Sequence, residues 1–410
     1  MSVLLQGVRV LDLSRILAGP WATQVLADFG AEVIKVERPG VGDDTRGWGP
    51  PFLASEDGSP TRESAYYLGA NRGKRSLAID FTTAEGQRLV RALAARSDVL
   101  VENYKVGGLA KYGLDHASLQ AVNPRLVYCS ITGFGQDGPY AHRAGYDAAI
   151  QAIGGLMSIT GEPDGVPGGG PQKVGVAVAD LMTGMYAVSA ILAALRHAER
   201  TGQGQHIDLA LLDTQVAWLA NQAMNHLVGG TVPGRQGTSH PNIVPYQVMP
   251  AADGHFMLAV GNDAQFARFC AVLGEPGLAT DPAYATNAAR VANREVLVPL
   301  LAERLARRPA AEWLAALEQA TVPCAPVNRI DQVFADPQVQ ARGLRVDLPH
   351  PQAGSVPGVA NPVRFSATPV RYGRAAPLLG EHSRQVLQDV LGLDEAEVAR
   401  LRDAGVVGTD

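Results

Sequence analysis

Residues 9–37, RVLDLSRILAGPWATQVLADFGAEVIKVE, carry the pattern that decides the fold. The two ends of the segment, residues 9–13 and 32–37, are rich in the branched apolar residues Val, Leu and Ile, as in buried strands. Gly19-Pro20 predicts the start of a helix between them, because proline is favoured in a first helical turn, and Gly30 predicts its end. This strand–helix–strand order predicts an α/β fold with a parallel sheet covered by helices on both faces.

The same alternation continues along the first half of the chain. Residues 99–102 and 126–132 read as further buried strands. Thr82-Thr83-Ala84-Glu85 resembles the capping box that begins a helix, so a helix is expected up to Arg96. The alternation ends near residue 216.

A different pattern follows that point. Residues 246–250 and 255–260 predict a hairpin, because Asp253-Gly254 between them is a turn signal. Helices are predicted over residues 262–273, 293–306 and 309–319. We therefore predict a large domain made of residues 1–215 plus 331–410 and a small α+β domain over residues 216–330. The proline- and glycine-rich stretch 345–380 is expected to connect back to the large domain.

Composition and charge exclude several classes of protein. The 410 residues are 46% hydrophobic and 18% charged, which excludes a disordered chain. The chain has 35 Lys+Arg against 40 Asp+Glu and therefore no excess of basic residues. Neither a nucleic acid nor an anionic membrane is predicted as a partner. Cys129, Cys270 and Cys324 form no CxxC pair, and their odd number fits a reducing compartment. The first residues lack the pattern of a signal peptide, so we expect a cytoplasmic protein.

One apolar stretch, residues 174–195, is long enough to cross a bilayer. Asp180 interrupts it, and the sequence has no second stretch of this kind. We therefore expect a buried strand followed by a core helix, and no membrane partner.

A glycine-rich segment, Gly133-Phe134-Gly135-Gln136-Asp137-Gly138, matches the G-x-G-x-x-G pattern of dinucleotide-binding proteins. That pattern should open a helix, because the pyrophosphate rests on the helix N-terminus. Here Pro139 follows, so a glycine-rich turn is the preferred interpretation and an NAD-dependent oxidoreductase is the weaker one. The histidines are scattered without ligand spacing, and no metal is predicted.

Asp180 is the sharpest candidate for chemistry. It follows the apolar run Val174–Ala179 and precedes a predicted helix. A carboxylate in such surroundings is costly unless it is paired, hydrogen-bonded or useful. It would suit a helix N-cap, and it would also suit a nucleophile at the carboxyl end of a strand, where open α/β sheets place their sites. Spacing alone favours the cap.

Cations follow two of the predicted strands. Arg38 follows residues 32–37, and Lys105 and Lys111 follow residues 99–102. Several cations after strands of one sheet suit a phosphate-bearing ligand, although each alone is typical of a solvated surface.

Taken together, these segments resemble the class III CoA-transferase (CaiB/BaiF) family. The resemblance rests on segments spread over nearly the whole chain: residues 7–20, 26–39, 71–76, 101–104, 123–126, 130–139, 145–147, 156–161 and 175–180. Within the family, residues 42–52, GDDTRGWGPPF, and Ile243-Val244-Pro245-Tyr246-Gln247 are most similar to the succinyl-CoA:glutarate branch.

The resemblance implies a fold that composition and spacing do not show. It implies a Rossmann-like large domain built from both ends of the chain, with the small domain inserted. It also implies that two such chains interlock as a homodimer.

The resemblance also implies the site. Asp180 matches the family's nucleophilic aspartate. The positions that match the family's contacts to coenzyme A are Leu17, Ala18, Arg38, Ile79, Asn103, Tyr104, Lys105, Lys111, Tyr146 and Asp147. Ala144 replaces a lysine of some family members, and Arg143 beside it is a possible substitute.

The implied activity is transfer of coenzyme A from an acyl-CoA to a carboxylic acid. The resemblance implies an aspartyl anhydride and then an aspartyl-CoA thioester, with the CoA thioester as substrate and no tightly bound cofactor. An isomerase of the α-methylacyl-CoA racemase type is the alternative. Gly145-Tyr146-Asp147 has tyrosine where that enzyme would have histidine. The unperturbed pKa of tyrosine, ~10, suits proton transfer near neutral pH less well than the pKa of histidine, ~6.5.

The branch resemblance predicts succinyl-CoA as donor and a short dicarboxylic acid such as glutarate as acceptor. A buried free carboxylate needs a cationic or hydrogen-bonding partner. Arg46, Arg72 and His240 lie in segments that resemble the branch, and any of them is a candidate for that partner.

Overall fold

The computed structural model describes residues 4–408 and divides into two compact units. The first unit comprises the described residues up to Gly155, then Val174–Asn221, and those from Pro337 onwards. The second unit comprises Leu156–Lys173 and Gln222–Asp336. The N-terminal and C-terminal parts of the chain therefore pack in one unit.

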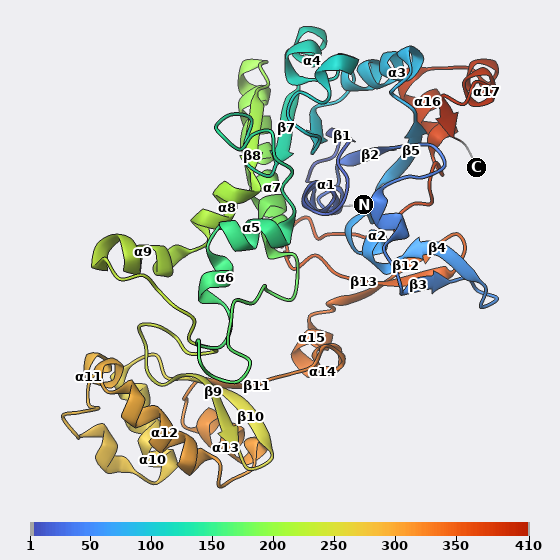
Figure 1. The fold of residues 1–410 in the computed structure, drawn as a ribbon. Coiled ribbons are helices and arrows are strands. Elements are labelled where there is room, and N and C mark those ends of the chain that lie inside the picture. Colours follow the sequence, from blue (N-terminus) through green and yellow to red (C-terminus); the bar gives the residue numbers. More distant parts are fainter. Residues whose placement is uncertain (1–3, 409–410) are drawn as a thin grey trace. The chain divides into compact units, whose positions relative to one another are not determined.

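A seven-stranded sheet organises the first unit (Figure 1). Its strands lie in the order β14-β5-β2-β1-β6-β7-β8, and all pair in parallel except β14, which is antiparallel to β5. The strands are β1 (Arg9–Asp12), β2 (Glu32–Glu37), β5 (Arg75–Ile79), β6 (Val99–Glu102), β7 (Val127–Thr132), β8 (His206–Ala210) and β14 (Val407–Gly408). The large parallel sheet confirms the predicted α/β class.

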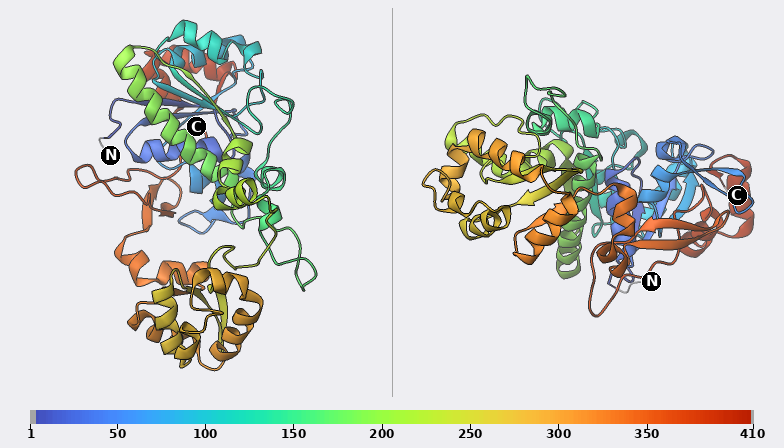
Figure 2. Two further views of the ribbon diagram at one scale, coloured as in Figure 1. Left: turned by 90° about the vertical axis from the view of Figure 1, so that its left-hand side faces the viewer. Right: turned by 90° about the horizontal axis from the view of Figure 1, so that it is seen from below.

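Each face of the sheet carries its own core. On one face, α1 (Ala18–Asp28) and α7 (Val178–Thr201) pack together with side chains such as Val10, Val101 and Ile191. Figure 2 shows α7, in green, running along that face. The other face is covered by α3 (Ala84–Ala94), α4 (His116–Val122), α16 (Ser383–Leu391) and α17 (Glu395–Asp403). Helices on both faces bury the sheet, as its apolar strands require.

The predicted buried strand before α7 is wrong. Residues 174–177 form no strand among the described residues, and Gly175 and Val176 are exposed. The backbone N–H of Val174 instead donates to the Gln151 side chain, and the helix begins at Val178. The α7 helix is long and apolar enough to cross a membrane by length and composition, but here it packs on the sheet through buried residues.

Shorter elements complete the first unit. The stretch 345–380 belongs to the first unit and contains an antiparallel hairpin that the sequence did not predict. The elements are η1 (Asp44–Gly47), β3 (Phe52–Ala54), β4 (Pro60–Ser64), α2 (Ala65–Ala70), η2 (Ala110–Tyr112), α5 (Asp147–Ile153), α8 (Leu211–Ala217), α15 (Pro337–Ala341), β12 (Arg345–His350) and β13 (Gly354–Val359).

The second unit is α+β. Its antiparallel sheet has the order β11-β10-β9, and the predicted hairpin and three predicted helices are confirmed. A separate core, including Phe256, Phe266, Leu301 and Trp313, lies between the sheet and the helices. The elements are α6 (Leu156–Ile159), β9 (Tyr246–Ala251), β10 (Gly254–Ala259), α10 (Asp263–Leu273), η3 (Pro276–Ala279), α11 (Asn287–Ala292), α12 (Arg294–Leu305), α13 (Ala310–Gln319), β11 (Cys324–Pro326) and α14 (Ile330–Ala335). Helix α9 (Ala220–Gly229) runs from the first unit into the second.

Candidate active site

The order of the strands locates the site. From β1 the chain proceeds outward through β2 and β5, and then returns to add β6, β7 and β8 on the other side of β1. The order therefore reverses between β1 and β6. In open α/β sheets, ligands bind at such a reversal, beyond the carboxyl ends of the strands.

A cavity of about 890 Å³ lies at this edge, and its lining comes entirely from the first unit. Segments after β1, β2, β5, β6 and β7 contribute to its wall, together with Asp180 from α7. Of the predicted site residues, those in the lining are Leu17, Ala18, Arg38, Ile79, Asn103, Tyr104, Lys105, Lys111, Tyr146 and Asp180. Asp147 is absent from the lining. The fold therefore gathers positions that are far apart in the sequence around one hollow.

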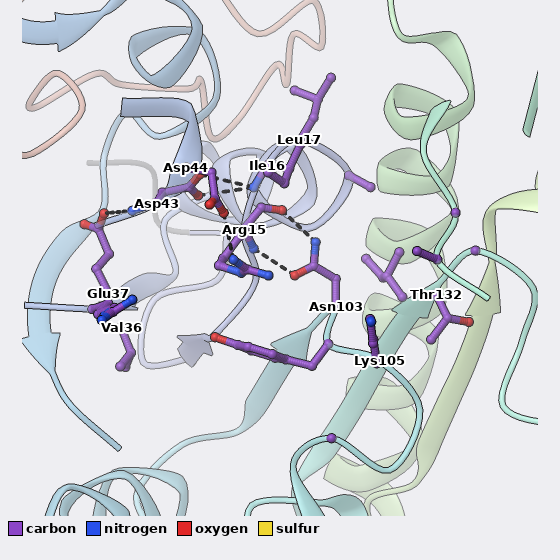
Figure 3. Close-up of a pocket in the computed structure, with 18 of the residues that line it drawn as sticks. Arg15, Ile16, Leu17, Val36, Glu37, Asp43, Asp44, Asn103, Lys105 and Thr132 are labelled. Atoms are coloured by element: carbon purple, nitrogen blue, oxygen red, sulfur yellow. Dashed lines mark hydrogen bonds and ion pairs between the residues drawn. The ribbon is translucent and has the colours of Figure 1, made fainter. Parts of the chain in front are cut away.

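The segment Arg15–Leu17 crosses the reversal point and is held from both sides (Figure 3). Asn103 accepts a hydrogen bond from the Arg15 backbone N–H at 2.9 Å and donates one to the Arg15 carbonyl at 2.6 Å. The Asp43 carboxylate accepts from the Ile16 backbone N–H at 3.2 Å. Ile16 has a φ of 72°, which is unfavourable for a β-branched residue and persists only when its surroundings fix it.

Buried ion pairs lie next to this segment and bind its backbone. The Lys35 ammonium pairs with Asp43 at 2.9 Å and donates to the Ser14 carbonyl at 2.8 Å, and both ionic side chains are shielded from solvent. Lys74 pairs with Asp12 at 3.0 Å, also out of contact with solvent. Burial alone would raise the pKa of Asp12, but Lys74 and Lys35 lower it to about 2. Both carboxylates are therefore fixed anions beneath the cavity.

Exposed cations lie at the rim of the cavity. Arg38 follows β2 directly, Lys105 follows β6, and Lys111 lies in η2. None of these three has a carboxylate partner among the residues that the structure describes, and each is exposed. Such a rim suits a ligand that carries phosphates, because the cations are free to pair with its oxygens.

Two glycines bring the 144–146 segment to the cavity. A Cβ on Gly133 would lie 2.5 Å from the Gly145 Cα, so only glycine permits the two backbones to touch. Gly133 follows β7, and no helix opens directly after it. The glycine-rich segment is thus a turn that admits a neighbouring loop, as preferred from the sequence.

Asp180 lies in the first turn of α7, three residues after the cap residue Ala177. It is therefore not the N-cap, contrary to the interpretation favoured by spacing. Gly184 lies one turn further on the same face, and a Cβ there would stand 2.8 Å from the Ala18 carbonyl oxygen. The close approach of α7 to α1 places Asp180 in the wall that Leu17 and Ala18 also line.

The electrostatics of Asp180 are unusual for a carboxylate. Burial raises its pKa to about 7, and the negative charge of Asp147 adds to the effect. Within residues 4–408 no hydrogen bond or ion pair reaches the Asp180 carboxylate. A carboxylate that is poorly solvated and unpaired is more basic, and therefore a stronger nucleophile once ionised.

Arg46 and Arg72 are not available for a substrate carboxylate, which corrects the prediction for them. Arg46 donates to both oxygens of Glu37 at 2.8 Å and to the Tyr67 hydroxyl at 2.6 Å. Arg72 donates to both oxygens of Asp28, at 2.9 and 2.6 Å. His240 belongs to the second unit and is absent from the cavity lining, and its Nδ1 accepts from the Asn242 N–H.

Sequence reasoning missed several residues of the site. Arg15, Asp43, Asp44 and Trp48 line the cavity, and none was among the predicted site residues. One signal was present for the buried pairs. Lys35 stands between Ile34 and Val36 in a predicted buried strand, and a charge there requires a partner. No local signal identifies that partner as Asp43.

The arrangement suits nucleophilic acyl chemistry on a phosphate-bearing substrate. It offers a half-buried, unpaired carboxylate in the wall of a cavity of about 890 Å³, and cations at the rim of that cavity. Among the described residues no three His, Cys, Asp or Glu side chains are grouped to hold a metal ion.

Comparison with known proteins gives a consistent assignment. The model of CoA-transferase family III matches residues 5–383. A succinate–glutarate CoA-transferase of Agrobacterium fabrum (strain C58 / ATCC 33970) is 56% identical over 94% of this chain and 95% of its own. A human succinyl-CoA:glutarate CoA-transferase is 46% identical over 98% of this chain and 90% of its own. The crystal structure of a CaiB/BaiF family protein from Brucella suis superposes with a TM-score of 0.83 at 52% identity, covering 95% of this chain and 100% of that one.

Proposed function

The chain belongs to CoA-transferase family III, and from this premise we propose that it transfers coenzyme A from succinyl-CoA to glutarate. The observation that carries the substrate assignment is its similarity, along nearly the whole chain, to relatives named for succinate or succinyl-CoA and glutarate. The cavity geometry supports the same reaction, because it combines a cationic rim with a poorly solvated carboxylate.

In the proposed mechanism, Asp180 is the nucleophile. Its ionised carboxylate attacks the carbonyl carbon of the succinyl-CoA thioester. The C–S bond breaks, CoA leaves as a thiolate, and a mixed anhydride of Asp180 and succinate forms. The thiolate then attacks the aspartyl carbonyl of the anhydride, which releases succinate and leaves CoA joined to Asp180 as a thioester.

The acceptor reverses these steps. The glutarate carboxylate attacks the aspartyl-CoA thioester, and a second anhydride and the thiolate form. The thiolate attacks the glutaryl carbonyl, so that glutaryl-CoA leaves and the Asp180 carboxylate is regenerated. Anhydride and thioester both hydrolyse, so the half-buried setting of Asp180 is useful because it limits access of water.

The cavity wall is the proposed binding site for CoA. The phosphates would pair with the rim cations Arg38, Lys105 and Lys111, which have no carboxylate partner in the described chain. The remaining proposed contacts are Leu17, Ala18, Ile79, Asn103, Tyr104 and Tyr146, which line the cavity. No tightly bound cofactor is required by this mechanism, because CoA enters and leaves as substrate and product.

We also propose that the protein acts as a cytoplasmic interlocked homodimer with no membrane or nucleic-acid partner. Support for the dimer comes from apolar side chains that a single chain leaves exposed: Leu227 is 74% exposed, Val228 79% and Val232 78%. Met185 and Tyr186 on α7 are exposed as well. The proposed domain division is residues 1–215 plus 331–410 and residues 216–330; the compact units differ from it in that Leu156–Lys173 groups with Gln222–Asp336.

A panel of acceptors tests the substrate assignment. The protein is incubated with succinyl-CoA and equal concentrations of glutarate, butyrate or oxalate, and the CoA esters are identified by mass. We expect glutaryl-CoA to form fastest, because butyrate lacks the second carboxylate and oxalate places it directly beside the first, so neither reaches a group that pairs with the distal carboxylate of glutarate. Equal use of butyrate or oxalate would overturn the glutarate assignment. Solvent deuterium entering the α-position of an acyl-CoA without transfer would instead favour the racemase alternative.

A further inference from the structure

The start of helix α7 is capped from another helix. The first backbone N–H groups of a helix have no partner within it and need acceptors from elsewhere. The cap residue Ala177 has no side-chain oxygen to offer. Asp147, at the start of α5, supplies the acceptor: its Oδ1 lies 2.8 Å from the Ala179 N–H nitrogen and 3.4 Å from that of Asp180.

The Asp147 carboxylate is itself fixed. Its Oδ2 accepts a hydrogen bond from the Gln151 side-chain amide at 2.6 Å. Gln151 is fully buried, and its carbonyl oxygen accepts from the Val174 backbone N–H at 2.9 Å. Gln151 therefore joins Asp147 to the irregular segment that leads into α7. Two side chains of α5 hold both the approach to α7 and its first turn.

We propose that Asp147 is a positioning residue that holds the Asp180 carboxylate at the cavity wall, and that Gln151 orients Asp147 for this task. The proposal rests on the proposed role of Asp180 as nucleophile. It replaces the expectation, drawn from resemblance, that Asp147 contacts CoA. The absence of Asp147 from the cavity lining agrees with this assignment.

The same contact has an electrostatic consequence. Among residues 4–408, the titratable groups that interact electrostatically with the Asp180 carboxylate are Asp147 and Tyr66 on α2. After burial, the charge of Asp147 is the cause that raises the pKa of Asp180. Asp147 thus keeps the carboxylate basic while it fixes the backbone that carries it.

Two substitutions separate the two effects. Asp147→Ala removes both the cap and the charge. Asp147→Asn keeps an oxygen that can accept from Ala179 but removes the charge. We expect kcat to fall about ten- to a hundredfold in Asp147→Ala, since small misplacements of a reacting group have effects of this size. The KM for succinyl-CoA should stay within about twofold, because no substrate contact is lost.

The pH profile gives a readout that a purely structural role would not move. In Asp147→Asn, the acid limb of kcat/KM should shift to lower pH, because the like charge beside Asp180 is gone. The double variant Asp147→Asn with Gln151→Glu reverses only the hydrogen bond between these two side chains, keeps the acceptors for the Ala179 and Val174 N–H groups, and returns a negative charge to α5. Its kcat should be closer to that of the wild type than the kcat of Asp147→Asn, and the acid limb of its kcat/KM profile should move back toward that of the wild type.

Amide hydrogen exchange tests the contact without relying on activity. Peptides spanning residues 176–186 should exchange faster in Asp147→Ala, because Ala179 and Asp180 lose their acceptor. Asp394→Ala is the matched control: Asp394 caps α17 through the Glu397 N–H at 2.8 Å and lies outside the cavity. It should leave kcat, KM and exchange at residues 176–186 unchanged.

The outcomes distinguish this inference from the proposed function. A raised KM with unchanged kcat in Asp147→Ala, or unchanged exchange at residues 176–186, would overturn the positioning role while leaving CoA transfer in place. Near-normal turnover by Asp180→Ala would overturn the nucleophile assignment, whereas the exchange result for Asp147 would stand.

Discussion

Lys35 and Asp43 form an ion pair of 2.9 Å that is closed off from solvent, directly beneath the segment that crosses the reversal point of the sheet. The same Asp43 carboxylate accepts the Ile16 N–H, so the pair fixes a residue whose φ of 72° is otherwise unfavourable. The Asp43 carboxylate therefore both neutralises the buried Lys35 charge and fixes the backbone at Ile16 in the cavity wall.

Asp43→Ala should destabilise the protein by about 3–5 kcal/mol, because it leaves the Lys35 charge buried without its partner. The free energy of unfolding in urea measures this. Asp44→Ala is the control, since Asp44 pairs with Arg15 where both side chains are more than 40% exposed, at 46% and 43%. We expect that variant to lose no more than about 1 kcal/mol. Equal losses in the two variants would contradict the role given to the buried pair.

Arg46→Met should impair folding and leave substrate choice intact. Arg46 makes paired hydrogen bonds to Glu37, and its loss exposes that buried carboxylate to an apolar environment, which costs about 3–5 kcal/mol. Arg329→Met, at a pair whose side chains are 73% and 66% exposed, is the matched control. Initial rates normalised to the folded fraction should give an unchanged ratio of glutarate to butyrate. A selective loss of glutarate use would return Arg46 to the substrate site.

Asp180→Asn should stabilise the protein at neutral and higher pH. The folded-state pKa of Asp180 is raised to about 7, whereas the unfolded chain ionises near ~3.9. Between these values the folded state holds a proton that the unfolded state has lost, so wild-type stability falls as pH rises through this window. The variant lacks this titration. Its advantage in urea unfolding should therefore be larger at pH ~8 than at pH ~4, and a difference that does not change with pH would contradict the raised pKa.

Activity should follow the opposite trend, because only the ionised carboxylate is a nucleophile. Below a pH of about 7, kcat/KM for succinyl-CoA should fall by about tenfold per pH unit. This parameter reports the free enzyme, which is the state the structure describes. A rate that stays level down to pH ~5 would show that Asp180 is ionised there or that another group carries the reaction.

Most of the fold could be predicted because its signals are local. The strands at residues 9–13 and 32–37 are rich in branched apolar residues, and Gly30 ends the helix between them. The error at residues 174–177 has a physical cause. An apolar run predicts burial in a strand, but here Gln151 takes the Val174 N–H and the run continues into a helix.

The site was less predictable because its contacts join distant parts of the chain. Asn103 holds Arg15 across 88 residues, and Asp147 holds Ala179 across 32. No periodicity encodes such pairs. Arg46 shows the converse problem, since a cation in a segment that resembles the glutarate branch suggests a ligand contact until its internal partners are known.

The central claim is that CoA becomes attached to Asp180 during transfer, and mass measurement of the protein tests it most directly. The protein is mixed with succinyl-CoA in the absence of an acceptor, quenched with acid, digested and analysed by mass spectrometry, with free CoA as the control. We predict an adduct of coenzyme A on the peptide that contains Asp180, lost when glutarate is added and absent from Asp180→Ala. An adduct on a different residue, or near-normal transfer by Asp180→Ala, would contradict the account.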